Sequence, residues 1–132
     1  KDPDLIESHF KEIESKIGLK SGQDSSSEWG VTHSINKVFK LTKHSASLEN
    51  FKQMASYYDI IFFDAFSPSK QPSIWCQSNL KKCFNYLKKN GVLVTYCAKG
   101  QFKRDLIAIR FEIETLPGAM GKWEMVRAQK VN

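Results

Sequence analysis

The stretch of residues 58–64 constrains the fold of this chain more than any other segment. It reads Tyr-Asp-Ile-Ile-Phe-Phe-Asp, so an apolar run is bounded on each side by an acidic residue. Such a run predicts a central parallel strand that is covered on both faces of its sheet. Because functional sites in open α/β sheets gather at the carboxyl ends of the strands, Asp64 is expected at the rim of a site.

The loop after this strand carries residue types suited to binding. Residues 65–75 include two prolines, a lysine and a tryptophan. Proline restricts the backbone, and binding residues are often placed on loops that a rigid scaffold positions. The segment is therefore predicted to form a rigid, shaped loop that holds a ligand.

The amino-terminal half gives four weaker signals. Apolar residues recur at helical spacing over residues 2–17, which predicts a helix. Residues 21–28 are polar and without periodicity, and they predict a flexible loop. Residues 38–41 predict a short strand, and the apolar spacing over 48–55 predicts a helix that leads into the next strand.

The carboxyl-terminal half alternates helical and strand patterns. In chain order it predicts a helix over residues 80–87 that ends at Asn90-Gly91, a buried strand over 92–97, a helix over 102–109, and a hairpin of strands over 111–116 and 122–130. This order favours an α/β, Rossmann-like, doubly wound layout with a mostly parallel sheet. The antiparallel hairpin at its end is typical of the class I methyltransferase sheet.

Composition sets the outer limits. A chain of 132 residues with 41% hydrophobic content predicts a single domain over residues 1–132. The formal charge of +6 fits a polyanionic partner and equally fits an ordinary basic surface. Three cysteines without Cys-x-x-Cys spacing predict neither a disulfide framework nor a metal site. No apolar stretch approaches the roughly 20 residues of a membrane span, and we expect a cytoplasmic protein.

Four blocks of sequence, met in order between residues 64 and 125, resemble one known family. The first is Asp-Ala-Phe-Ser-Pro-Ser-Lys-Gln-Pro-Ser-Ile-Trp over residues 64–75, and the others lie in 91–100, 103–106 and 116–125. They resemble the methyltransferase domain of the MnmC family, the tRNA 5-methylaminomethyl-2-thiouridine methyltransferases, and its stand-alone relatives.

The resemblance implies transfer of a methyl group from S-adenosylmethionine to the aminomethyl nitrogen of the wobble uridine in tRNA. It also implies an FAD-dependent oxidoreductase partner in the pathway. Attack of an amine on a sulfonium methyl group needs little covalent help, so positioning and desolvation should carry the catalysis. Asp64 is the implied catalytic residue. It could act as a base or only orient the amine, and a nearby carboxylate also favours the protonated, unreactive amine.

The resemblance also assigns binding residues. Asp64, Ala65 and Phe66 are expected to contact the cofactor. The residues expected to contact the substrate are Phe66, Pro68, Lys70, Trp75, Lys99, Lys103, Arg104 and Lys122. The two aromatic side chains could stack on a splayed-out base or could simply pack in the core. The cations could meet phosphates or be merely solvated.

The sequence departs from the family in three places. Arg110 stands where the relatives usually have glycine, and Trp123 replaces a customary arginine. No glycine-rich loop follows an early strand, although such a loop lets the backbone approach the cofactor closely. We therefore expect a carboxyl-terminal portion that lacks the first two strands, unless other elements replace them.

Loss of those strands would leave the strand over residues 58–64 with an unpaired edge. A second copy could pair with that edge, and the chain alone could bind the cofactor poorly. Two alternative functions stay open. One is a non-catalytic RNA-binding or interaction module that has lost its cofactor half, and the other is an N-methyltransferase for a small-molecule amine.

Overall fold

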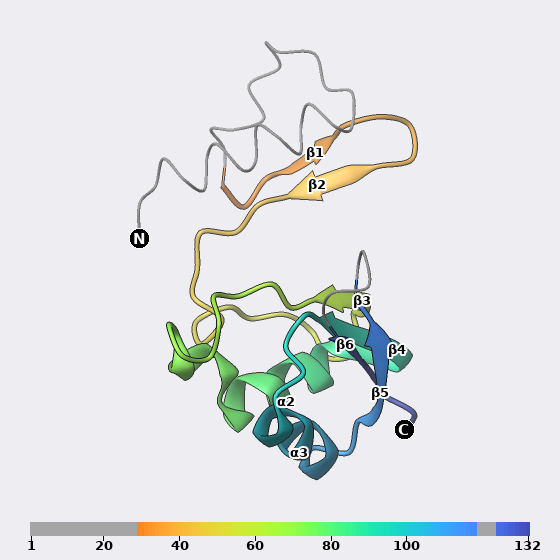
Figure 1. The fold of residues 1–132 in the computed structure, drawn as a ribbon. Helices are drawn as coiled ribbons and strands as arrows, with labels where there is room; N and C mark the ends of the chain where they lie inside the picture. The colour runs from red at the N-terminus through yellow and green to blue at the C-terminus, as the bar shows by residue number, and fades with distance from the viewer. Residues whose placement is uncertain (1–28, 119–123) are drawn as a thin grey trace. The chain divides into compact units, whose positions relative to one another are not determined.

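The computed structural model describes residues 29–118 and 124–132 (Figure 1). The chain separates into two compact units, Lys1–Ala46 and Ser47–Asn132. The helix predicted over residues 2–17 and the loop predicted over 21–28 lie outside the described residues. A single domain over the whole chain stays a prediction.

The described part of the first unit is a β-hairpin. Strand β1 (Thr32–Ser34) pairs antiparallel with β2 (Lys40–Thr42). The side chain of Asn36 accepts the backbone N–H groups of Val38 and Phe39, each at 2.9 Å, and this forms the turn. The strand predicted over 38–41 therefore starts two residues later, because its first residue belongs to a turn that Asn36 closes. It pairs within this hairpin, and the large sheet of the second unit does not include it.

The helix predicted over residues 48–55 is wrong. The backbone makes one turn, in which the Phe51 N–H donates to the Ser47 carbonyl at 2.8 Å, and then becomes irregular. Side chains of a later helix take the carbonyl groups that a continued helix would use. The Lys82 amine donates to the Leu48 and Glu49 carbonyls, and the Tyr86 hydroxyl donates to the Phe51 carbonyl. Tertiary contacts thus override the local apolar spacing.

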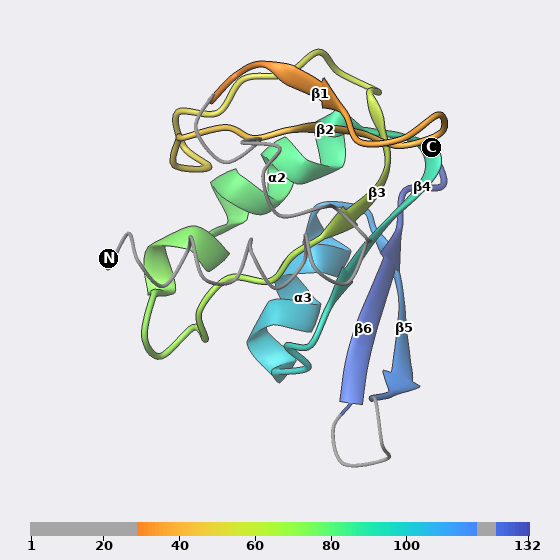
Figure 2. The same cartoon turned by 90° about the horizontal axis from the view of Figure 1, so that it is seen from above.

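The second unit is built on a four-stranded mixed sheet of order β3-β4-β6-β5. Its strands are β3 (Tyr58–Phe62), β4 (Leu87–Thr95), β5 (Glu112–Pro117) and β6 (Glu124–Gln129). β3 and β4 are parallel, and β6 lies antiparallel between β4 and β5. Three strands therefore run in one direction and the last one opposes them, as the predicted hairpin requires (Figure 2).

Two helices cover one face of this sheet. α2 (Gln77–Tyr86) connects β3 to β4 after the short 3-10 helix η1 (Pro72–Trp75), and α3 (Gly100–Ala108) connects β4 to β5. Their buried side chains meet the inward-facing residues of the strands in one core, which contains Phe63, Trp75, Leu80, Cys83, Leu87, Leu93, Cys97, Phe102, Leu106, Phe111, Val126 and Ala128. Figure 2 shows both helices on the same side of the sheet. This is the apolar face that alternation along each strand predicts.

The opposite face of the sheet differs from the prediction at β3. β3 lies at the edge of the described sheet, and Ile60 and Phe62 on its outer face are 50% and 75% exposed. Coverage of this strand on both faces was therefore wrong for the described residues. The unpaired edge that loss of the first two strands predicts is present in the described sheet.

The junction between α2 and β4 differs from the sequence prediction. α2 ends at Tyr86, and Asn90 adopts the expected left-handed conformation (φ 65°) inside β4 instead of at a helix end. Between the pairs Tyr58–Leu87 and Ile60–Val92 the register shifts, so the extra residues bulge outward. A Cβ atom at Gly91 would lie 2.9 Å from the Lys88 carbonyl oxygen and 3.1 Å from that of Asp59. Glycine is required there by close backbone approach.

Arg110 ends α3 in a conformation that favours glycine. Its φ is 82°, its N–H donates to the Ile107 carbonyl at 2.9 Å, and the Phe111 N–H donates to the Leu106 carbonyl at 3.0 Å. These two bonds form a Schellman motif, whose left-handed residue is usually glycine. The glycine expected from the relatives therefore has a backbone cause, and this chain meets the same geometry with arginine.

Replacing Arg110 with Gly should raise the free energy of unfolding by about 1 kcal/mol, because a left-handed residue with a Cβ atom is strained. Urea denaturation followed by circular dichroism would measure the change. Arg110→Ala is the matched control, since it removes the same charge and keeps the strain. An equal gain in both variants would show that charge, not backbone conformation, is the cause.

Candidate active site

Asp64 lies at the carboxyl end of β3. The Phe63 N–H donates to the Val94 carbonyl at 2.9 Å, so pairing with β4 continues one residue beyond the strand. Phe63 is buried in the core, and the next side chain, Asp64, is exposed on the other side of the chain. The carboxylate therefore stands where the sheet ends and the loop begins.

Two aromatic side chains donate hydrogen bonds to the main chain of the first part of this loop. The Tyr96 hydroxyl donates to the Ala65 carbonyl at 2.7 Å, and the Trp75 indole N–H donates to the Phe66 carbonyl at 2.7 Å. These two carbonyl groups are consecutive along the chain and directly follow Asp64. The loop is thus fixed to the sheet and to η1 through its main chain.

The rest of the loop forms a tight turn. The N–H groups of Lys70 and Gln71 both donate to the Ser67 carbonyl, at 2.8 and 2.9 Å, and the hydroxyls of Ser67 and Ser69 lie 2.9 Å apart. Pro72 then begins η1, where the fixed φ of proline suits a helix start. Pro68 is half-buried in this turn and Lys70 is exposed on it.

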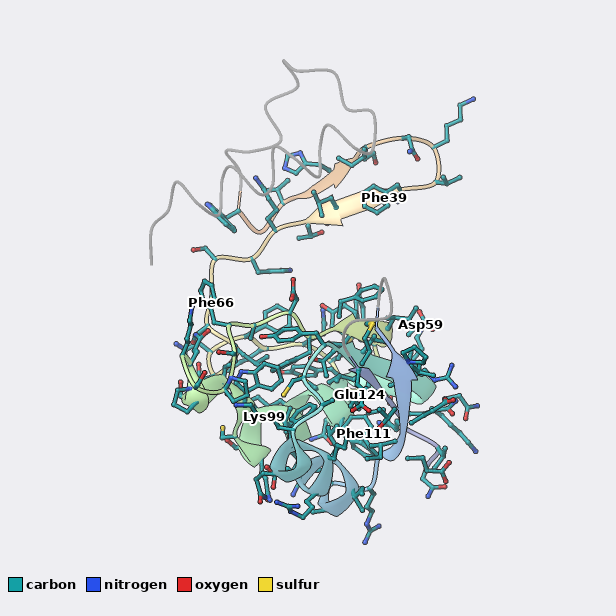
Figure 3. All side chains as sticks on the ribbon, viewed as in Figure 1. Phe39, Asp59, Phe66, Lys99, Phe111 and Glu124 are labelled. Atoms are coloured by element: carbon teal, nitrogen blue, oxygen red, sulfur yellow. The ribbon has the colours of Figure 1, made fainter. Side chains whose placement is uncertain are left out.

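The two predicted aromatic walls have different surroundings. Trp75 is only 6% exposed, and its ring packs edge-on against Phe63, Phe102 and Tyr96, with centroid distances of 4.9, 5.2 and 6.1 Å. Trp75 therefore packs in the core, which was the alternative to stacking on a splayed-out base. Phe66 lies two residues after Asp64 on the loop, and its side chain, which Figure 3 labels, is 52% exposed.

Three of the predicted cations gather at the start of α3. Lys99 directly precedes the helix and is exposed; its side chain is labelled in Figure 3. The Lys103 amine lies 4.0 Å from the Glu124 carboxylate, and the Arg104 guanidinium donates to the side chain of Gln101. Lys122 and its neighbour Trp123 lie outside the described residues. Because β3 and β4 are parallel, Lys70 and this α3 group follow strand ends at the same edge of the sheet.

Tyr96 is the site residue that sequence reasoning missed. It follows β4 directly, and Asp64 lies two residues after the end of β3. Adjacent parallel strands bring their carboxyl ends together, so the position of Tyr96 near the end of a predicted strand could have indicated that it lies near Asp64. Burial raises the pKa of the Tyr96 phenol, with further contributions from Cys97 and Asp64, and the hydroxyl stays a donor at neutral pH.

Two classes of site are not found in the described part of the chain. Residues 29–118 and 124–132 contain no group of three or more His, Cys, Asp or Glu that could hold a metal ion. Within the same residues, none of the helices has the length and apolar character needed to cross a membrane.

The three cysteines should differ sharply in reactivity. A hydrogen bond from Ser78 lowers the pKa of the exposed Cys76 thiol, and burial raises the pKa of Cys83 to about 12. Cys97 is buried. Since the thiolate is the reactive form, iodoacetamide at pH 8 should label Cys76 first, and the other two should require denaturant. Peptide mass spectrometry gives the measurement.

The control for this labelling is Ser78→Ala, which removes the first cause of the lowered pKa at Cys76. The rate at Cys76 should then fall while Cys83 and Cys97 stay unlabelled. Labelling of Cys83 in the native protein as fast as that of Cys76 would contradict the assigned burial.

A known protein family matches most of the chain. The family model described as S-adenosyl-L-methionine-dependent methyltransferase matches residues 32–131. The chain belongs to this family. The family resemblance stated from the sequence blocks is thereby confirmed.

The similar proteins refine the picture. The chain is 31% identical over 87 residues to the tRNA 5-methylaminomethyl-2-thiouridine biosynthesis bifunctional protein MnmC of Actinobacillus pleuropneumoniae, covering 63% of this chain and 13% of that protein. It is 29% identical over 79 residues to MnmC of Pseudomonas putida, covering 60% and 12%. The chain thus spans about one eighth of the length of these relatives.

A solved structure supports the fold. MNMC2 from Aquifex aeolicus superimposes with a TM-score of 0.54 at 22% sequence identity, covering 61% of this chain and 26% of that one. This likeness shows the fold alone, a small α/β domain with a mixed sheet. The Rossmann-like, class I arrangement remains a prediction beyond it.

Proposed function

We propose that this chain takes part in transfer of a methyl group from S-adenosylmethionine to the aminomethyl nitrogen of the wobble uridine in tRNA. The observation that carries the proposal is the exposed pair Asp64 and Phe66 at the carboxyl end of β3. Family membership supports the methyl donor, and the names of the MnmC relatives support the acceptor.

The described residues fit one side of a cofactor site. Asp64, Ala65 and Phe66 follow an edge strand and combine a carboxylate, a small residue and an exposed ring. A carboxylate can accept hydrogen bonds from ligand hydroxyl or amino groups, and the ring can cover an apolar surface. No Gly-x-Gly pattern follows a strand within residues 29–118 and 124–132, so the opposite side of that site is not among them. When bound, the cofactor supplies a methyl group made electrophilic by its sulfonium sulfur.

The chain's own part in the reaction is positioning. The amine nitrogen forms a bond to the methyl carbon, the carbon–sulfur electron pair returns to sulfur, and the product ammonium then loses one proton. Asp64 is proposed to accept an amine N–H, which aims the nitrogen lone pair and offers an acceptor for that proton. Phe66 is proposed to cover the reacting groups and exclude water.

The cations are proposed to bind the tRNA backbone. Lys70 lies on the loop after β3, Lys99 directly precedes α3, and Lys103 and Arg104 lie in the first turns of α3. Lys122 is included as a sequence prediction. Phosphate contacts fix the register of a nucleic acid without reading its sequence. A partner FAD-dependent oxidoreductase and pairing of two copies through the β3 edge belong to the same proposal.

The decisive experiment is a methyl-transfer assay with the intact protein, radiolabelled S-adenosylmethionine and undermodified tRNA. Incorporation into tRNA is the expected result. Absence of incorporation by a protein whose circular dichroism shows an intact fold would overturn the proposal.

The absence of a Gly-x-Gly pattern after a strand in the described residues also favours a second candidate function. A non-catalytic RNA-binding or interaction module would keep the sheet and release no heat when titrated with S-adenosylmethionine. A third candidate, an N-methyltransferase for a small-molecule amine, would bind its acceptor with little dependence on salt. A tRNA substrate gives a steep dependence, since each phosphate contact releases counterions.

A further inference from the structure

Tyr96 occupies an unassigned position beside the proposed site. Its hydroxyl donates to the Ala65 carbonyl at 2.7 Å, and its ring is 42% exposed at the end of β4. The ring also packs edge-on against Trp75 at a centroid distance of 6.1 Å. The side chain thus lies between the loop after β3 and the core below it.

The two anchored carbonyl groups flank a single residue. The Ala65 carbonyl belongs to the peptide that enters Phe66, and the Phe66 carbonyl belongs to the peptide that leaves it. Tyr96 holds the first and Trp75 holds the second, each at 2.7 Å. Fixing both peptide planes leaves the backbone little freedom at Phe66, and the direction of its Cβ is set by the backbone.

We propose that Tyr96 is a positioning residue, which fixes the peptide before Phe66 and thereby aims the Phe66 ring and the adjacent Asp64 carboxylate at the reacting groups. This rests on the proposed function of the same site. Trp75 is buried and also supports the core, whereas Tyr96 is half exposed, so its hydroxyl serves the loop in particular.

The Tyr96 hydroxyl stays protonated across the neutral pH range. Burial, Cys97 and Asp64 all raise its pKa, so the hydrogen bond to Ala65 keeps its proton across the neutral range. A neutral donor also adds no charge beside the cofactor.

The test is Tyr96→Phe, which removes one oxygen atom and keeps the ring. Hydrogen exchange followed by mass spectrometry should show about fivefold faster exchange in peptides covering residues 64–71, in line with the loss of one hydrogen bond. Peptides from the β4–β6 pairing should be unchanged. Equal exchange in the wild type and the variant would overturn the proposal.

The matched control is Tyr86→Phe. This tyrosine hydroxyl also donates to a main-chain carbonyl, that of Phe51 at 2.9 Å, but Tyr86 precedes the start of β4, whereas Tyr96 follows its end. Its loss should leave exchange over residues 64–71 unaltered. The same acceleration in both variants would show general loosening and contradict a specific role for Tyr96.

A kinetic arm uses the intact protein. Tyr96→Phe should lower kcat about fivefold with a smaller change in KM, because misaimed Phe66 and Asp64 side chains stabilise the transition state less. Unchanged kcat despite faster exchange would overturn the positioning role. Absence of methyl transfer in the wild type would overturn the proposed function instead, and hydrogen exchange would still decide whether Tyr96 fixes the segment.

Discussion

Replacing Asp64 with Asn should lower kcat/KM for methyl transfer by about 100- to 10,000-fold, the range for loss of a positioned acid–base group. Asparagine keeps the size of the side chain and loses its charge. Since the Asp64 side chain is exposed, the fold should not change. Steady-state methyl transfer to undermodified tRNA, with circular dichroism as a check on folding, is the measurement.

The control for this variant is Asp59→Asn. Asp59 is an exposed carboxylate of the same strand, at its opposite end, where it pairs with Lys88 at 3.2 Å. Exposed ion pairs contribute little to stability, so this variant should keep full activity. A rate for Asp64→Asn that stays within about threefold of wild type would remove Asp64 from the chemistry.

Trp75→Ala should reduce the free energy of unfolding by about 3–5 kcal/mol, the usual cost of truncating a buried aromatic side chain. The indole fills the space between Phe63, Phe102 and Tyr96, and it also donates to the Phe66 carbonyl. Both the core and the loop should therefore suffer. Urea denaturation followed by circular dichroism gives the value.

Two further variants separate the causes. Trp75→Phe keeps an aromatic ring and loses the indole donor, so its loss should be intermediate. Trp29→Ala removes an exposed tryptophan and should change stability by less than about 1 kcal/mol. A loss below about 1 kcal/mol for Trp75→Ala would show that its packing does not stabilise the core.

The carboxyl-terminal half of the fold was predictable because its signals are local and agree with one another. α2 and α3 have apolar residues at helical spacing, and the strands after them have apolar runs or alternation. The last two predicted strands were expected to form an antiparallel hairpin, and β5 and β6 pair in that way. The two helices and the two hairpin strands were expected within three residues of their observed bounds, whereas β4 begins at Leu87, five residues before the predicted strand.

The segment before β3 was not predictable from local patterns. Its apolar spacing suits a helix, but Lys82 and Tyr86, more than thirty residues later in the chain, take its carbonyl groups. A donor that arrives from another element leaves no trace in a short window of sequence. The hairpin of β1 and β2 depends similarly on one Asn36 side chain that closes its turn.

The sequence predicted only part of the candidate site. A carboxylate directly after an apolar strand marks Asp64, because the carboxyl ends of such strands lie at the edge of the sheet where sites form. The roles of Trp75 and Tyr96 are harder to predict, because the sequence does not show whether the aromatic ring packs in the core or the polar atom forms a hydrogen bond. In this fold both act on the loop through their polar atoms, one from the core and one from the surface.

The loop after β3 is tied down at carbonyl oxygens, which every amino acid possesses. Side chains at positions 65 and 66 can therefore be exchanged during evolution while the supports beneath them persist. A substitution at Phe66 would thus change the chemical surface that the loop presents and would keep the two hydrogen bonds that hold its main chain.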